Sequence, residues 1–206
     1  LVASFASEKI YSQVLVKENF ETLGALKDQV NPWSLTKWTY SSGTESYTVT
    51  ADTIHYTGYL GGGNRTSFIS SSNGIINLPF GTAVTSGTLY TSLLIKMTYI
   101  GSEGSYFFGF NSTPTSTSGQ RCLIYAKKLA SGKVQFGLGS RTTAQVWSDS
   151  IYSLNKTYLM VIRYKVVAGT VVNDEFSFIV NPEMNTTEPD DSLWVKQKNT
   201  WSTDIN

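Results

Sequence analysis

The stretch that decides the fold is TYLMVIRYKVV, residues 157–167. Side chains alternate along it between two faces of an extended strand. One face is wholly apolar, with Met160, Ile162, Tyr164 and Val166. The other face becomes polar towards its end, with Leu159, Val161, Arg163 and Lys165. Residues 175–180, EFSFIV, alternate in the same way, so the two segments are predicted to form the centre of a sheet that is buried on one side.

Similar runs rich in Val, Ile, Tyr, Phe and Thr recur along the chain, separated by Gly, Ser, Asn or Pro, which is typical of an all-β sandwich or barrel. Almost no helix is expected, and residues 14–23 are interpreted as a strand because their apolar residues alternate early. The clearest predicted strands cover residues 89–100, 106–111, 122–128, 134–138, 157–167, 175–181 and 193–197.

Turn residues lie between these runs. Residues 168–170 and 173–174 separate the two central strands, and residues 130–133 form a hairpin loop, so neighbouring strands are predicted to be antiparallel. Residues 61–77 and 111–120 are rich in Ser, Thr and Gly, and they are predicted to be long surface loops.

The length of 206 residues fits one domain, placed at residues 13–206. Residues 1–12 begin with LVASFAS, in which Ser4 and Ala6 have the spacing seen at the end of a secretory signal peptide. An apolar linker or first strand is the alternative for this segment.

Composition excludes several classes of function. Sixteen basic and fifteen acidic side chains give a net charge of +1 without a basic stripe, so nucleic acid is not an expected partner. The single cysteine, Cys122, excludes an intrachain disulfide and a cysteine zinc site. No apolar run reaches the roughly 18 residues of a membrane-spanning helix, so no membrane insertion is expected.

Catalytic constellations are not visible in the sequence. His55 is the only histidine and has no Ser or Cys motif near it, and Cys122 lies in an apolar run that predicts a buried thiol. Glu188 and Asp190 have the spacing of a carboxylate pair but lie in a Pro-containing loop and not on a strand. The sequence therefore favours a protein that is not an enzyme.

Calcium is the one metal that the sequence leaves open, because loops can supply its oxygen ligands without a fixed motif. The candidate ligands are Asn181, Glu188, Asp190 and Asp191. A merely solvated acidic loop is the alternative, and no other cofactor is predicted.

Aromatic residues provide the remaining signal for a ligand, because sugar rings stack on them while polar neighbours bond the hydroxyls. In residues 144–149, Gln145, Trp147 and Asp149 share one face, which predicts an exposed tryptophan. Trp147, with Tyr59, Arg65 and Arg121 beside the two long loops, is the predicted binding surface. Packing of these aromatics in the core is the alternative.

The order of segments also resembles a known family. The segments are residues 17–21, 56–60, 87–95, 106–108, 121–127, 136–138, 158–164, 173–174 and 180–182. Over residues 15–198 this order resembles the concanavalin A-like (LamG-type) jelly-roll modules of secreted Bacteroidetes-type surface proteins.

The resemblance implies a jelly roll of two stacked antiparallel sheets with about 12–14 strands in all. It also implies a secreted, extracellular location at the cell surface and a carbohydrate-binding or adhesive role within a longer multidomain chain. Related laminarinase-like hydrolases carry an E-x-D-x-x-E strand that this chain lacks, so no hydrolase activity is implied. These modules usually close with a further strand after residues 193–197, whereas this sequence stops at Asn206, so either the closing strand is irregular or the polypeptide is a fragment that lacks it. A structural or adhesive spacer that contacts other proteins is the alternative function, and a glycan-active enzyme is the third.

Overall fold

The computed structural model describes residues 14–32, 34–42, 47–59, 63–67, 74–81, 83–113, 119–140, 145–167, 174–184 and 187–198. These parts of the chain contain thirteen strands and one short 3₁₀ turn, η1 (Asp191–Leu193), and no α-helix. The protein is therefore all-β, as predicted. The expected signal-peptide tail at residues 1–12 lies outside the described residues.

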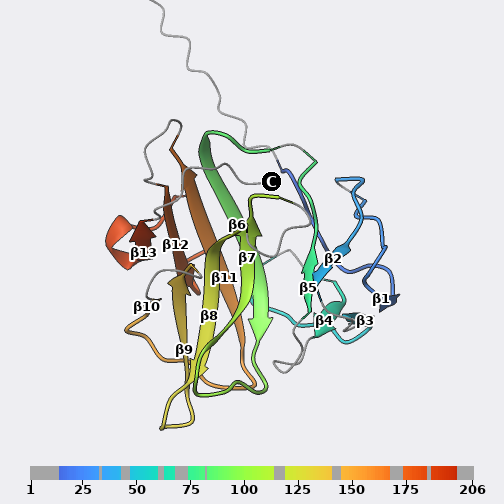
Figure 1. Cartoon of the computed structure of the whole chain (residues 1–206). Coiled ribbons are helices and arrows are strands. Elements are labelled where there is room, and N and C mark those ends of the chain that lie inside the picture. Colours follow the sequence, from blue (N-terminus) through green and yellow to red (C-terminus); the bar gives the residue numbers. More distant parts are fainter. Residues whose placement is uncertain are drawn as a thin grey trace, which may run out of the picture.

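Two four-stranded antiparallel sheets face each other (Figure 1). Sheet I has the order β13 (Val195–Lys198), β12 (Glu175–Val180), β11 (Thr157–Val166) and β6 (Gly87–Lys96). Sheet II has the order β10 (Val146–Trp147), β9 (Val134–Gly139), β8 (Gln120–Lys128) and β7 (Ser105–Asn111). The predicted central pair, β11 and β12, is confirmed as the middle of sheet I.

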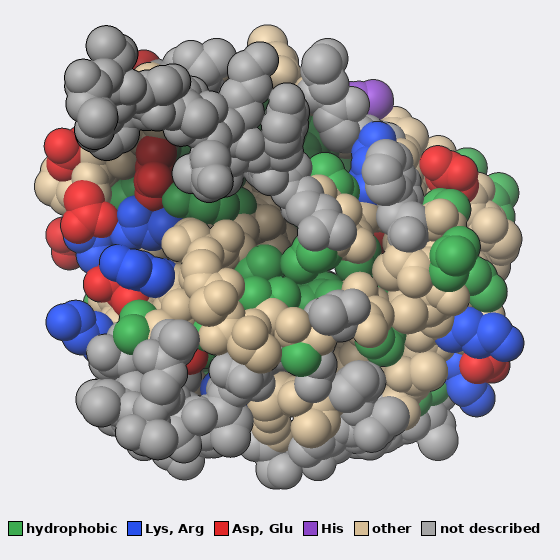
Figure 2. Space-filling model, turned by 90° about the horizontal axis from the view of Figure 1, so that it is seen from above, with side chains coloured by type: hydrophobic (Ala, Val, Ile, Leu, Met, Phe, Trp, Pro, Cys, Tyr) green, Lys and Arg blue, Asp and Glu red, His purple; other side chains and the backbone are tan. Residues whose placement is uncertain are grey.

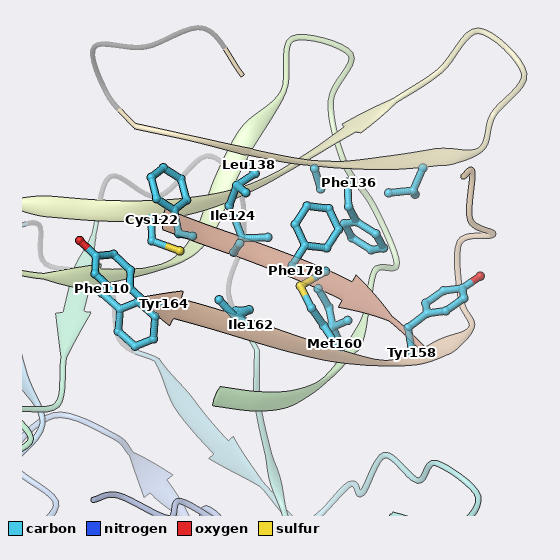
Figure 3. Close-up of a cluster of buried hydrophobic side chains, with 14 of the residues drawn as sticks. Phe110, Cys122, Ile124, Phe136, Leu138, Tyr158, Met160, Ile162, Tyr164 and Phe178 are labelled. Carbon is cyan, nitrogen blue, oxygen red and sulfur yellow. The ribbon is translucent and has the colours of Figure 1, made fainter. Parts of the chain in front are cut away.

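The core lies between these two sheets, where side chains from both point toward one another (Figure 3). Ile124 and Phe136 of sheet II face Ile162, Tyr164 and Phe178 of sheet I, and all five are at most 1% exposed. The face predicted to be buried in β11 is thus the core face. Its opposite face, which carries Arg163, points away from sheet II.

Five short strands form a separate layer beside the sandwich (Figure 1). One sheet contains β1 (Gly24–Ala25), β3 (Thr48–Thr50) and β4 (Arg65–Ser67), and the other contains β2 (Thr39–Ser42) and β5 (Ile75–Asn77). Leu26 and Val49 form its small buried centre. The fully buried Asn31 binds the Glu18 carboxylate, which also accepts a hydrogen bond from Trp38 Nε1 at 2.9 Å.

Three sequence predictions require correction or adjustment. Residues 14–23 form no strand, because Phe20 adopts φ 52° and its N–H bonds the Glu18 carboxylate at 2.6 Å. Residues 61–77 are not one surface loop, since they contain β4 and β5. The last strand begins at Val195, after the η1 turn, and not at residue 193. The predicted hairpin at residues 130–133 does connect β8 and β9.

Candidate functional site

The outer face of sheet I carries a polar cluster centred on Arg163. In the strand register Arg163 lies between Tyr90 of β6 and Ser177 of β12, so the three side chains share the face opposite the core. Arg163 is only 12% exposed at its side chain, whereas Tyr90 is 53% exposed. A rigid sheet therefore positions a mostly covered cation next to an accessible aromatic ring.

Arg163 holds the segment 187–194 on this face. Its Nη1 donates to Glu188 Oε1 at 2.6 Å, and its Nη2 donates to Asp191 Oδ1 at 2.8 Å. Its Nε donates to Ser177 Oγ at 3.1 Å, and the guanidinium carbon lies 4.6 Å from the centre of the Trp194 ring. The planar guanidinium thus joins two strands and one loop through a fork of hydrogen bonds.

Two aspartates in the segment held by Arg163 have lowered pKa values. Hydrogen bonds from Lys196 and from Arg163 lower the pKa of Asp191, and hydrogen bonds from Ser192 lower the pKa of Asp190. Burial lowers the pKa of Arg163, but its bonds to Asp191 and Glu188 outweigh burial and raise it. A general acid needs a raised carboxyl pKa, so these acids have the opposite character.

Two tyrosines complete the surface. Tyr90 donates its hydroxyl hydrogen to Glu188 Oε2 at 3.0 Å, and the hydroxyls of Tyr59 and Ser92 lie 2.8 Å apart. Burial and the bond to Glu188 raise the pKa of Tyr90, so this hydroxyl keeps its proton at neutral pH. We call the side chains of Tyr59, Tyr90, Ser92, Arg163, Ser177, Glu188 and Asp191 the Arg163 surface.

An open groove of about 870 Å³ adjoins the Arg163 surface through Glu188. It follows the edges of the two sheets at β10 and β13, and exposed Val146 and Leu193 are among its lining residues. Its lining includes four carboxylates and one ammonium group: Asp149, Glu183, Glu188, Asp190 and Lys196. Figure 2 shows charged side chains of both signs gathered on the side where η1 and β13 lie in Figure 1.

Trp147, the main residue of the predicted binding surface, is half-buried and not freely exposed. Its indole lies over Gly137, where an added Cβ would be 2.5 Å from Trp147 Cε3. Lys127 Nζ lies 3.9 Å from the ring centre, and the Tyr125 ring meets the indole edge-on. The neighbouring Val146 is exposed at the edge of sheet II.

The other three predicted residues of that surface lie in different settings. Tyr59 belongs to the Arg163 surface, and Arg65 forms an ion pair with Asp52 in the small layer. Arg121 is only 5% exposed, so its predicted place on the surface is wrong. Burial lowers the pKa of Arg121, and charge interactions with Tyr164 and Asp174 partly oppose this decrease. The structure therefore does not bring the four residues together.

The four residues considered for calcium already have other bonds. Asn181 Oδ1 accepts from the Leu159 N–H at 3.0 Å, and Asp190 accepts from the N–H and hydroxyl of Ser192. Glu188 and Asp191 both form ion pairs with Arg163, so its guanidinium cation already binds these two carboxylates. Among the described residues, no three His, Cys, Asp or Glu side chains form a group that could hold a metal. Calcium binding by these residues stays a prediction.

Residues considered for nucleophilic catalysis lie apart. His55 is exposed, and its Nε2 is 2.9 Å from the Thr53 hydroxyl oxygen. Cys122 is fully buried in β8, and burial raises the pKa of its thiol well above the ordinary value. A thiol with a raised pKa is a poor nucleophile, which agrees with the prediction of a buried structural cysteine.

Sequence reasoning did not identify Tyr90, Ser92, Arg163 or Trp194 as site residues. The sequence contains one signal for Arg163: this charged residue interrupts the outer face of a strand that is otherwise largely apolar. Its partners Glu188 and Asp191 lie in the acidic segment 187–191. They are 25 and 28 residues away from Arg163 in the chain, so the sequence alone does not show this contact.

Comparison with known proteins gives no relative, since no family model, no curated protein and no solved structure matches the chain. Among the described residues, no helix has the length and apolar character needed to cross a membrane.

Proposed function

We propose that this chain is a non-catalytic, extracellular carbohydrate-binding module and that the Arg163 surface carries its ligand. In this proposal the two facing sheets form a concanavalin A-like jelly roll within a longer secreted or cell-surface protein. The proposal rests on the side chains of one sheet face, together with the order of segments in the sequence.

The observation that carries the proposal is the fixed setting of the exposed Tyr90 ring. Its hydroxyl is held by Glu188, which is in turn held by Arg163, and the Ser92 and Tyr59 hydroxyls lie on the same face. Sugar rings offer apolar C–H faces to an aromatic ring and hydroxyls to surrounding polar groups. Because these groups are already ordered, binding would cost little side-chain entropy.

The chemistry of the nearby acids supports binding in preference to hydrolysis. Glycoside hydrolysis needs one carboxyl group that keeps its proton and a second that remains charged. The pKa values of Asp190 and Asp191 are lowered, so neither carboxyl group has the raised pKa that a general acid needs.

The test is a screen of soluble polysaccharides and oligosaccharides, followed by affinity measurements on two variants. Tyr90→Ala should weaken the best ligand about tenfold, the effect of losing one aromatic contact of about 1.4 kcal/mol. Tyr99→Ala is the matched control, because Tyr99 is 70% exposed and lies beyond the end of β6. No binding to any carbohydrate, or equal losses in both variants, would overturn the proposal.

An adhesive spacer that contacts other proteins is the second candidate. Exposed Val146, Ile151 and Leu193 lie near the edges of the two sheets, and exposed apolar side chains at such edges favour protein contacts. Lys196 and Lys198 on β13 oppose the addition of a further strand. Sedimentation analysis separates the candidates, because the spacer should self-associate and the binding module should remain monomeric.

A further inference from the structure

We infer that the ligand of this site is an oligosaccharide with free amino groups, such as a glucosamine oligomer. This inference rests on the proposed function and specifies the class of sugar. It follows from the charge of the groove that adjoins the Arg163 surface.

The groove is negative although the whole chain is nearly neutral. Four carboxylates and one ammonium line it, which gives a local charge of −3, against +1 for the chain. The ammonium group, Lys196, already forms an ion pair with Asp191. A hollow whose lining has an excess of one sign of charge concentrates ligands of the opposite sign and repels those of the same sign.

Two of these carboxylates are available to a ligand. Asp149 and Glu183 are exposed and form no hydrogen bond or ion pair within the described chain. Glu188 and Asp190 contribute their charge while they are bonded to Arg163 and Ser192. Ammonium groups of an amino sugar could therefore pair with Asp149 and Glu183 without disrupting the protein's own ion pairs.

The groove also suits the uncharged part of a sugar chain. Exposed Val146 and Leu193 offer apolar contacts, and the exposed Ser150 and Ser192 offer hydroxyls along the same lining. Glu188 belongs to both the groove and the Arg163 surface, so an extended oligosaccharide on Tyr90 would reach the groove. Uronate polymers would place like charge against these carboxylates, which disfavours their binding.

The experiment compares three tetramers by titration calorimetry: glucosamine, N-acetylglucosamine and galacturonate. The glucosamine tetramer should bind on the order of fivefold more tightly than the acetylated one, given the modest strength of exposed ion pairs. Galacturonate should not bind. Raising the ionic strength from about 0.05 M to about 0.5 M should remove the preference for the amino form.

The double variant D149N/E183Q should lose the preference for glucosamine and retain its affinity for the acetylated tetramer. The control E21Q/D28N removes the same charge in the small layer and should behave like the parent protein. Equal affinity for the amino and acetylated tetramers would overturn the inference and leave the proposed function standing. Tetralysine binding as tightly as the glucosamine tetramer would overturn it as well, because the groove would then recognise positive charge alone and not an amino sugar. Absence of all carbohydrate binding would overturn the proposed function itself.

Discussion

Replacing Arg163 by methionine tests whether this residue holds segment 187–194 on sheet I. Methionine keeps much of the aliphatic volume but removes the bonds to Ser177, Glu175 and Glu188. Glu175 and Glu188 are 28% and 45% exposed at their side chains, so both can partly rehydrate. Asp191 is more exposed still, so we assign no energy to its pair.

The expected loss of stability lies between the limits for exposed and buried pairs. Exposed pairs contribute about 0–1 kcal/mol, and breaking a buried pair costs about 3–5 kcal/mol. Because Arg163 is mostly covered but its partners are not, we expect about 2 kcal/mol. For a chain of this size that corresponds to a decrease of about 4–8 °C in Tm.

Urea unfolding followed by tryptophan fluorescence measures this loss. The slope of the unfolding free energy against urea concentration should be the same in variant and parent, as expected when only stability changes. Lys165→Met is the matched control, because Lys165 lies on the same face of β11 and is exposed. That control should change stability by less than about 0.5 kcal/mol. A loss in Arg163→Met no larger than in the control would refute the role assigned to Arg163.

Three further predictions concern packing, pH and a buried hydrogen bond. Gly137→Ala places a Cβ 2.5 Å from the Trp147 ring, so we expect a loss of about 1–3 kcal/mol in urea unfolding and a changed emission spectrum. Asp191 has a lowered pKa in the fold, so its contribution is complete above the unfolded value of about 3.9 and is lost as pH falls through the folded value. Stability measured against pH should therefore decrease below about pH 4, and less steeply in Asp191→Asn; parallel curves would contradict this. Tyr164→Phe removes the donor that lies 2.8 Å from Asp174 Oδ2 in a buried setting, so unfolding should show a loss of about 1–3 kcal/mol, and an unchanged midpoint would contradict it.

The central strands were predictable because their alternation is regular. The core face of β11 follows directly from the period of two, and the structure buries each of its members. The small layer was less predictable, since β4 and β5 have only three residues each and lie in Ser- and Gly-rich sequence. Short strands of this kind depend on pairing with distant partners and have little periodicity of their own.

The candidate site was predictable only in parts. Glu188 and Asp191 were identified as oxygen donors, and Tyr59 as a ligand contact, but Arg163 was not recognised as their common neighbour. Trp147 shows the opposite error, because the polar sequence around it does not reveal that Gly137 leaves space for its ring. Both errors arise because contacting residues are separated in the chain, Arg163 by 25 residues from Glu188 and Trp147 by ten from Gly137.

The most direct test of the central claim is to map the ligand on the folded protein by NMR. Amide shifts of the isotopically labelled chain would be followed during titration with the best-binding oligosaccharide. We predict that the largest changes lie at Tyr90, Ser92, Arg163 and Glu188 on the outer face of sheet I. Changes confined to sheet II, with none on the outer face of sheet I, or no saturable change at all, would contradict the assignment of ligand binding to the Arg163 surface.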